Sequence, residues 1–327
     1  MTDFYDRVND LINQKNILTT ESFFMRPVGT SSIQCAGFPG LGQNNFKKNG
    51  VTNTTVATKA AVINKFEETF VQAPGQLIDE LSGLPYLAVE LQHPEYQFTT
   101  TSTTFELPHR IGSGVFAINQ SRGDNWDFER LLLEKMKEVG PYNAIAFYDP
   151  ISAILGSFLS HYKSIPSQWS KVTGAVIGGC VAINTQPVIS AGVTQDPLGA
   201  NKEEHLVLDA SEKGKASSAG LGNIIHLEND IDAEHILLHL YLNQSRLKFY
   251  KPEIRKLLTT IYQYGALNLM SDGIDFRNRC YLKPLKEVEF DRDKLAKEIK
   301  KQINECRKKE LISIEPLTRT LPIAYNK

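Results

Sequence analysis

The chain has 327 residues, with 36 Lys or Arg and 37 Asp or Glu, so its formal net charge is −1 at pH 7. Hydrophobic residues make up 41% and charged residues 22%, which is the composition of an ordinary globular protein. This balance excludes a chain that attracts nucleic acid through bulk positive charge, although a basic face can still be balanced by an acidic one.

Three features of the sequence predict a cytoplasmic protein. No apolar run approaches the length of a membrane span. Residues 1–16 are mixed in charge and lack the apolar centre of a secretory signal. The four cysteines lie far apart, with neither a pairing pattern nor a metal-binding spacing, so we expect reduced thiols. They are Cys35, Cys180, Cys280 and Cys306.

The first 140 residues predict one arm, three helices and two or three strands. Residues 22–53 are rich in Gly, Pro, Ser and Asn, which is typical of a long loop or irregular arm. Apolar residues at helical spacing predict helices over residues 4–17, 56–70 and 126–139, the last closed by Gly140. The strand candidates are residues 84–92, 97–107 and 115–118.

The centre of the chain predicts a strand, a helix and a second strand. Residues 144–148 are an apolar run of strand length, and Asp149 followed by Pro150 is a strong helix start. Apolar residues then recur at helical spacing as far as Tyr162. The run over residues 171–179 predicts the second strand, and its glycines indicate the close approach of another backbone or a ligand. This order predicts an α+β or α/β nucleus.

The remainder of the chain predicts a second arm, three helices and one strand. Residues 194–225 hold a short β-like run between polar, glycine-bearing segments, which fits either a flexible arm that closes on phosphates or a plain surface hairpin. We expect helices over residues 232–247, 252–270 and 291–310, and a strand over residues 274–282. The last helix mixes both charge signs outside its apolar face, which is typical of a solvated surface helix.

No set of residues in the sequence predicts catalysis. Residues 112–117 have the spacing of a dinucleotide fingerprint, but the sequence after them predicts a strand instead of the required helix. Residues 212–217 lack both the first glycine and the hydroxyl of a phosphate-binding loop. His235 and His239 lie four apart on a predicted helix, where half-burial is a simpler interpretation than a metal site. We therefore predict no catalytic residue, no metal and no cofactor.

The predicted strand over residues 274–282 fits nucleic-acid binding better. Strict alternation places Arg277, Arg279 and Tyr281 on the face opposite the apolar residues. Two guanidinium groups and an aromatic ring on one face can pair with phosphates and stack on bases. An exposed strand whose arginines form surface ion pairs is the alternative.

Seven segments, in the same order along the chain, resemble one family: the backbone subunit of type I-G CRISPR surveillance complexes, a subtype formerly called I-U. The segments are SIQCAGFPGLG (32–42), ATKAAVINKFEE (57–68), GLPYLAVE (83–90), TTSTTFELPHRIGS (100–113), YDPISAILGSFLS (148–160), SSAGLGNI (217–224) and GIDFRNRCYL (273–282). The chain departs from the family at Lys65, where an arginine is usual, and at residues 60–61, where the family is more polar.

The resemblance implies a single α+β unit over residues 1–327: a modified RRM-like (ferredoxin-like) palm with large insertions. The insertions would form finger and thumb arms at about residues 22–53 and 194–225, and a helical segment would follow at about residues 285–327. Copies of such a subunit assemble along a crRNA in the Cascade complex, grip its phosphates and leave its bases free to pair with target DNA. The implied partners are the crRNA, further copies, the large subunit, the fused repeat-processing and capping subunit, and the helicase–nuclease that alone cleaves.

Thirteen residues are candidate RNA contacts, because they are basic, polar or aromatic and lie in the arms or in the matching segments. They are Arg26, Lys47, Lys48, Lys59, Asn64, Lys65, His109, Arg110, Lys213, Lys215, Arg277, Arg279 and Tyr281. Two other functions stay open from the residues alone. One is a small-molecule-binding α/β enzyme that uses the glycine-rich central sheet, and the other is a purely structural assembly protein.

Overall fold

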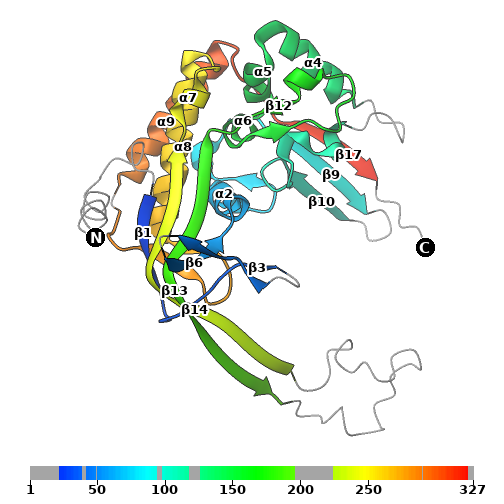
Figure 1. The fold of residues 1–327 in the computed structure, drawn as a ribbon. Coiled ribbons are helices and arrows are strands. Elements are labelled where there is room, and N and C mark those ends of the chain that lie inside the picture. Colours follow the sequence, from blue (N-terminus) through cyan, green and yellow to red (C-terminus); the bar gives the residue numbers. More distant parts are fainter. Residues whose placement is uncertain are drawn as a thin grey trace, which may run out of the picture.

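The computed structural model describes residues 22–38, 42–48, 50–93, 98–117, 126–195, 224–288 and 290–322 (Figure 1). An α+β protein is confirmed: helices pack on predominantly antiparallel sheets. Within the described segments, no helix is both long and apolar enough to cross a membrane. The helix expected over residues 4–17 lies outside the described residues.

The largest sheet has the spatial order β15-β16-β1-β14-β13-β6-β5, and β2 also pairs with β14. Its strands are β1 (Ser22–Pro27), β2 (Ile33–Gln34), β5 (Asn45–Lys48), β6 (Val51–Ala57), β13 (Val176–Thr194), β14 (Ile224–Leu242), β15 (Ile274–Asp275) and β16 (Tyr281–Pro284). Strands β13 and β14 pair antiparallel along their whole length and project from the body as a long hairpin (Figure 1).

Two helices complete a repeated connection around the centre of this sheet. Helix α2 (Lys59–Glu68) lies in sequence between β1 and β13, and α8 (Pro252–Asp272) lies between β14 and β16. In space the four strands run β16-β1-β14-β13, all antiparallel. The chain therefore follows the path strand–helix–strand–strand–helix–strand. In the sheet, β14 lies between β1 and β13, the two strands connected through α2, and β1 lies between β14 and β16, the two strands connected through α8.

Both helices pack on the same face of the sheet. Gly178 of β13 has no side chain because a Cβ there would lie 2.6 Å from Val62 of α2. The Phe66 ring of α2 stacks on Tyr262 of α8 at 5.9 Å, and the Tyr262 hydroxyl donates to the Leu240 carbonyl oxygen. Alternate residues of β14 are accordingly buried against the helices, and the residues between them are half-buried on the opposite, helix-free face. The buried set is Ile236, Leu238, Leu240 and Leu242.

A second layer covers the end of the molecule away from the long hairpin (Figure 1). Its three-stranded sheet joins β10 (Phe98–Thr103), β9 (Leu87–His93) and β17 (Leu317–Pro322), with β17 parallel to β9. Its helices are α4 (Phe128–Val139), α5 (Pro141–Tyr148) and α6 (Pro150–Leu155), while α9 (Arg292–Lys308) packs on α8. The short elements are β3 (Gly37–Phe38), β4 (Gly42–Gln43), β7 (Val71–Ala73), β8 (Gln76–Leu77), β11 (Ser157–Phe158), β12 (Lys171–Val172), α3 (Gly114–Ala117), α7 (Gln244–Leu247) and three 3-10 turns.

Several predicted elements are confirmed. Helices α2, α4, α8 and α9 form where helical spacing predicts them, and β9 and β10 match the two strand candidates before residue 108. The predicted caps are also present. Asp149 accepts a hydrogen bond from the Ser152 amide at 2.9 Å ahead of Pro150, and Gly140 ends α4 with a φ of 81°.

Five secondary-structure predictions differ from the structure. Residues 144–148 belong to helix α5, residues 115–117 belong to α3, and the helix after Pro150 ends at Leu155 because Gly156 adopts a φ of 93°. The run over residues 171–179 is split between β12 and β13. Residues 232–242 form strand β14 instead of a helix, because their alternate leucines face α8 while β13 and β1 supply hydrogen-bond partners.

The first predicted arm is also corrected. The described part of residues 22–53 is not a loop but contributes β1 to β5 and the start of β6, so most of it belongs to the sheets. Of the second predicted arm, residues 194–195 and 224–225 lie at the outer end of the β13–β14 hairpin, and residues 196–223 lie outside the described residues.

Candidate nucleic-acid interface

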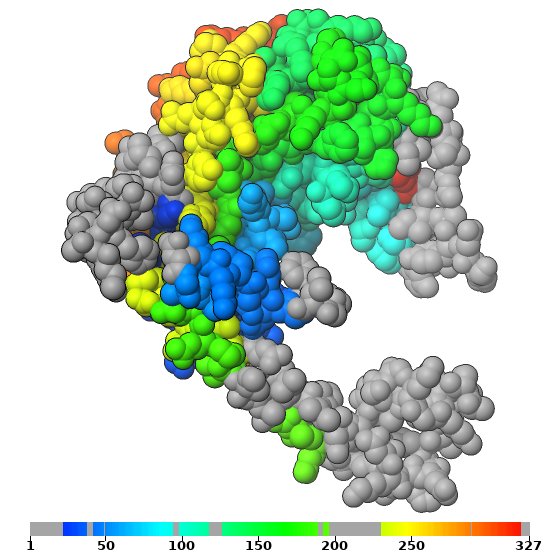
Figure 2. All heavy atoms as spheres, in the orientation of Figure 1, coloured from blue at the N-terminus to red at the C-terminus, as the bar shows by residue number. Residues whose placement is uncertain are grey.

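The molecule is hollowed on one side (Figure 2). The β9–β10 region bounds the hollow above, the segment that holds β3 to β6 and α2 forms its inner wall, and the β13–β14 hairpin reaches out below it. Edge strand β5 therefore lies beside a concave surface, which is the shape that can follow an extended polymer.

Strand β5 brings two of the predicted contacts together. Lys47 and Lys48 are both exposed and pair in register with Thr52 and Val51 of β6. Phe46, beside them, is 40% exposed. Asn45 holds the other end of the strand through a hydrogen bond from the Thr54 hydroxyl at 2.7 Å. Because successive side chains of a strand point to opposite faces, Lys48 shares a face with Phe46 and Lys47 lies on the other face. An ammonium group on each face and an exposed ring on a fixed strand can contact a nucleic-acid backbone and stack on a base.

Helix α2 carries three further candidates on the same wall. Lys59 is the first residue of the helix and is exposed, as is Asn64 about 1.4 turns later. The Lys65 ammonium lies 2.8 Å from Glu68 Oε2, so that charge is partly neutralised within the helix. Of the basic residues on α2, Lys59 therefore offers its full charge to a ligand.

The helix-free face of the main sheet holds another basic cluster. Arg26 of β1 is exposed and lies opposite Lys283 of β16 in the strand register. The Lys283 ammonium lies 5.8 Å from the Tyr281 ring centroid, and the Tyr281 hydroxyl donates to the Asp272 carbonyl oxygen at 2.6 Å. Lys283 was missed by the sequence reasoning, although continuing the alternation past Leu282 places it beside Tyr281.

The predicted strand over residues 274–282 is instead a hairpin. Strands β15 and β16 are joined by a turn in which the Phe276 amide donates to the Cys280 carbonyl oxygen at 3.1 Å and Arg279 adopts a φ of 62°. Arg277 and Arg279 therefore sit in the turn and do not share a strand face with Tyr281. Alternation failed here because the turn residues are not in extended conformation.

Both turn arginines bind other parts of the protein. Arg277 Nη1 donates to the carbonyl oxygens of Val56 at 2.8 Å and Gln34 at 3.0 Å. Arg279 Nη2 lies 2.5 Å from Asp230 Oδ2, which also accepts from the Ser32 hydroxyl at 2.8 Å. These bonds connect the turn to β2, β6 and the base of the projecting hairpin. RNA contact by either arginine stays a prediction.

Three buried cysteines lie around Arg277. Burial raises the pKa of Cys35 to about 12 and that of Cys280 to about 11, and it raises the pKa of Cys180 well above its usual value. Thiols with such pKa values are protonated and unreactive at neutral pH. Within the described residues the cysteines are free, and no group of three His, Cys, Asp or Glu could hold a metal ion.

The predicted His-Arg pair consists of one exposed side chain and one half-buried side chain. His109 is exposed. Arg110 instead forms a bidentate pair with Glu67 of α2, in which Nε donates to Oε1 at 2.8 Å and Nη2 donates to Oε2 at 2.7 Å. Burial raises the pKa of Glu67 to about 7, and the Arg110 guanidinium opposes that rise. Arg110 therefore joins the loop after β10 to helix α2, whereas His109 can reach a ligand.

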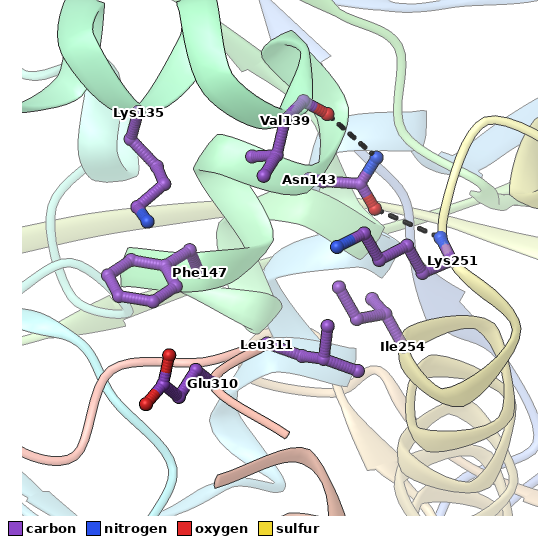
Figure 3. A pocket seen from close by; sticks show the side chains of 8 residues that line it. All are labelled: Lys135, Val139, Asn143, Phe147, Lys251, Ile254, Glu310 and Leu311. Atoms are coloured by element: carbon purple, nitrogen blue, oxygen red, sulfur yellow. Dashed lines mark hydrogen bonds between the residues drawn. The ribbon is translucent and has the colours of Figure 1, made fainter.

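A small pocket lies where α4 and α5 meet the start of α8 and residues 310–311 (Figure 3). Asn143 closes one side by donating to the Val139 carbonyl oxygen at 3.2 Å and accepting from the Lys251 amide at 2.9 Å. The cavity volume of about 10 Å³ has room for one water molecule and not for an organic substrate. Gly178 could have marked a ligand site in the central sheet, but the Val62 side chain occupies the space beside it.

The fold and surface define an α+β protein with a hollowed side, a projecting β-hairpin and exposed lysines on an edge strand. Residues 23–187 match the family model described as CRISPR-associated protein GSU0053. Since the match covers half of the chain, the chain belongs to this CRISPR-associated family. No curated protein matches the chain. Lys213 and Lys215 lie outside the described residues.

Proposed function

We propose that the chain is the repeated, crRNA-binding backbone subunit of a type I-G Cascade complex. In this role copies line up along the guide RNA, hold its phosphates and present its bases to target DNA. Membership of the CRISPR-associated family supports a place in such a complex. The role is non-catalytic, and cleavage falls to a separate helicase–nuclease.

The observation that carries this proposal is the chain path at the centre of the large sheet. The order β16-β1-β14-β13 with α2 and α8 on one face agrees with the connectivity expected of a ferredoxin-like, or RRM-like, domain and so supports the palm that we propose. In this palm the second and third strands, β13 and β14, continue beyond the sheet as a hairpin (Figure 1). A palm with such a projecting hairpin has the shape that the proposed subunit needs. The hairpin is then the thumb, and the hollow beside β5 is the path of the RNA.

The exposed cations support backbone binding over base reading. Lys47, Lys48 and Lys59 end in ammonium groups, which bind phosphate as point charges without selecting a base. Guide-directed recognition leaves the sequence to base pairing, so a subunit of this kind needs no base-specific set. The homo-oligomer would contact the large subunit, the capping subunit and the helicase–nuclease at its ends and sides.

Co-expression with a repeat array and the other subunits tests the proposal. We expect the chain to purify with RNA of uniform length that carries repeat sequence, and to lose that RNA when the array is omitted. Sequencing the co-purified RNA identifies it. Purification without RNA in the presence of all partners would contradict the proposal, and turnover of a small molecule by the purified chain would favour the enzyme alternative.

Charge reversal on β5 tests the RNA path itself. We expect Lys47→Glu with Lys48→Glu to retain less RNA and to lower the salt dependence of binding by roughly two phosphate contacts. The matched control is Lys137→Glu with Lys163→Glu, which changes the same charge at exposed sites on α4 and in the loop after β11. Equal RNA retention by the two double variants would move the path away from β5.

A further inference from the structure

The exposed side of helix α9 carries mostly lysines. Its sequence, RDKLAKEIKKQINECRK, carries seven Lys or Arg and three Asp or Glu, in a chain whose net charge is −1. Ile299, Gln302, Ile303 and Cys306 are buried against the body. At 100° per residue, the five exposed lysines lie on the opposite side of the helix. We call them the lysine stripe: Lys294, Lys297, Lys300, Lys301 and Lys308.

The acidic residues of α9 offset this stripe only in part. Exposed Asp293 lies on the same side of the helix, so the five lysines keep a net positive charge there. Glu298 lies toward α8, where it pairs with Lys256 at 2.9 Å. Lys309, just after the helix, pairs with Glu253 of α8 at 2.6 Å. No member of the stripe forms an ion pair within the described residues. The two ion pairs thus fasten α9 to α8, while five ammonium groups point to solvent from a rigid helix.

We propose that the lysine stripe is a docking surface for the sugar–phosphate backbone of double-helical DNA. From Lys294 to Lys308 the helix rises about 21 Å, which equals roughly six base pairs of duplex. Along the axis, successive lysines are about 5 to 10 Å apart, except Lys300 and Lys301, which are about 1.5 Å apart. A row of positive charges of this length neutralises several phosphates on one strand of a straight polyanion.

Duplex DNA fits this surface better than a single strand or an acidic protein. Proteins that bind single strands combine a basic groove with aromatic side chains on which bases stack. The stripe is convex, and the exposed residues on this side of the helix are its lysines, Asp293 and Asn304, none of which is aromatic. Recognition of carboxylates at protein interfaces favours the planar fork of arginine, whereas every cation of the stripe is a lysine. Duplex phosphates require neither a stacking platform nor a fork.

The stripe is separate from the proposed path of the RNA. In Figure 1, α9 lies beside α8 on the side of the molecule away from the hollow. The inference therefore does not depend on guide-RNA binding, and each can fail alone. In an assembly of several copies, such stripes would hold duplex DNA on the outer surface by sequence-independent contacts.

The test is duplex binding by the chain with Lys297→Glu and Lys301→Glu. We measure fluorescence anisotropy with a labelled DNA duplex of about 24 base pairs at about 0.1 M salt. We expect the double variant to bind roughly ten- to a hundredfold more weakly than the parent chain, with a salt slope lower by about two contacts. The control, Lys137→Glu with Lys163→Glu, changes net charge equally and should bind as the parent does.

Three results would overturn the proposal: equal weakening by the control pair, unchanged duplex binding by the stripe variant, or tighter binding of a single strand of the same length through the stripe. A fourth such result would be displacement of the duplex by a polyglutamate peptide at equal charge, because it would indicate an acidic protein partner. A thermal melt checks that both variants are folded. RNA co-purification with the stripe variant should be unchanged, so a loss of RNA alone would count against the proposed RNA path and not against the stripe.

Discussion

The β15–β16 turn and helix α9 use the same type of charge in opposite ways. In the turn, Arg277 and Arg279 are bound to carbonyl oxygens and to a carboxylate that is 2% exposed. On α9, Lys297 and Lys301 form no ion pair among the described residues and face solvent. The arginines hold parts of the fold together, whereas the lysines add charge without holding structure. A cation's role here depends on its partners and not on its residue type.

Arg110 provides the strongest test of the first kind of cation. Its guanidinium group and the Glu67 carboxylate form a pair whose side chains are 13% and 8% exposed. We expect Arg110→Ala to lower the free energy of unfolding by about 3–5 kcal/mol at pH 8, because a buried carboxylate is left without its partner. Chemical denaturation measures this. Adding Glu67→Gln should recover a large part of the loss, and a loss below about 1 kcal/mol would contradict the structural role.

Arg279 should show a smaller effect of the same kind. Asp230 would keep only the Ser32 hydroxyl after Arg279→Ala, so we expect a loss of about 2–3 kcal/mol in the free energy of unfolding. Alternation placed Arg277 and Arg279 on the face opposite the apolar residues, whereas the contacts of both side chains in the structure predict that their loss destabilises the fold. Arg279→Ala with Asp230→Asn is the matched variant, and it should be more stable than Arg279→Ala alone. Wild-type stability of the single variant would refute this reading of the turn.

The pH dependence of stability should identify Glu67. Burial raises its pKa in the folded chain to about 7, above its value in the unfolded chain. The folded chain therefore binds more protons between about pH 4.5 and pH 7, so this residue's contribution to stability falls as the pH rises through that window. We expect Glu67→Gln to remove a change on the order of 1–3 kcal/mol. Parallel pH profiles for the variant and the parent would show that Arg110 keeps the carboxylate ionised throughout.

The contrast between these regions also explains which features could be predicted from the sequence. The caps at Asp149 and Gly140 were predictable because they depend on neighbouring residues. Arg110 and Glu67 are 43 residues apart, and Arg279 and Asp230 are 49 apart, so nothing local shows that they meet. Helical spacing found the amphipathic helix α9, but the partners of its acidic residues on α8 decide which charges are left unpaired.

Strand β14 was misread for the same reason. Its residues 235–242 are almost continuously apolar, a pattern that either a helix or a buried strand can show. The hydrogen-bond partners that make it a strand lie in β13 and β1, far away in sequence. The candidate contacts on β5 could be named from the sequence because they are lysines in a polar segment. Their position on an edge strand beside the hollow required the fold.

Lys65 lies between the two kinds of cation and gives the smallest effect. Its ammonium group pairs with Glu68 at 2.8 Å, and the two side chains are 29% and 62% exposed. We expect Lys65→Ala to cost only about 0.3–0.5 kcal/mol of stability, because exposed pairs one helical turn apart are weak. If Lys65 also contacts the guide, Glu68→Ala should leave the Lys65 ammonium group without its carboxylate partner and so free to bind a phosphate. We expect RNA binding to become about two- to threefold stronger, the equivalent of roughly 0.5 kcal/mol.

Helix α4 offers a matched control for this pair. Lys135 and Glu138 have the same spacing, a 2.7 Å contact and similar exposures of 20% and 63%. Glu138→Ala removes the same charge at a site outside the proposed RNA path and should leave RNA affinity unchanged. A gain with Glu68→Ala but not with Glu138→Ala would place Lys65 on the RNA, since both variants change net charge equally. An equal gain with both would reflect net charge alone, and Lys65 would then join the cations that only stabilise their own helix.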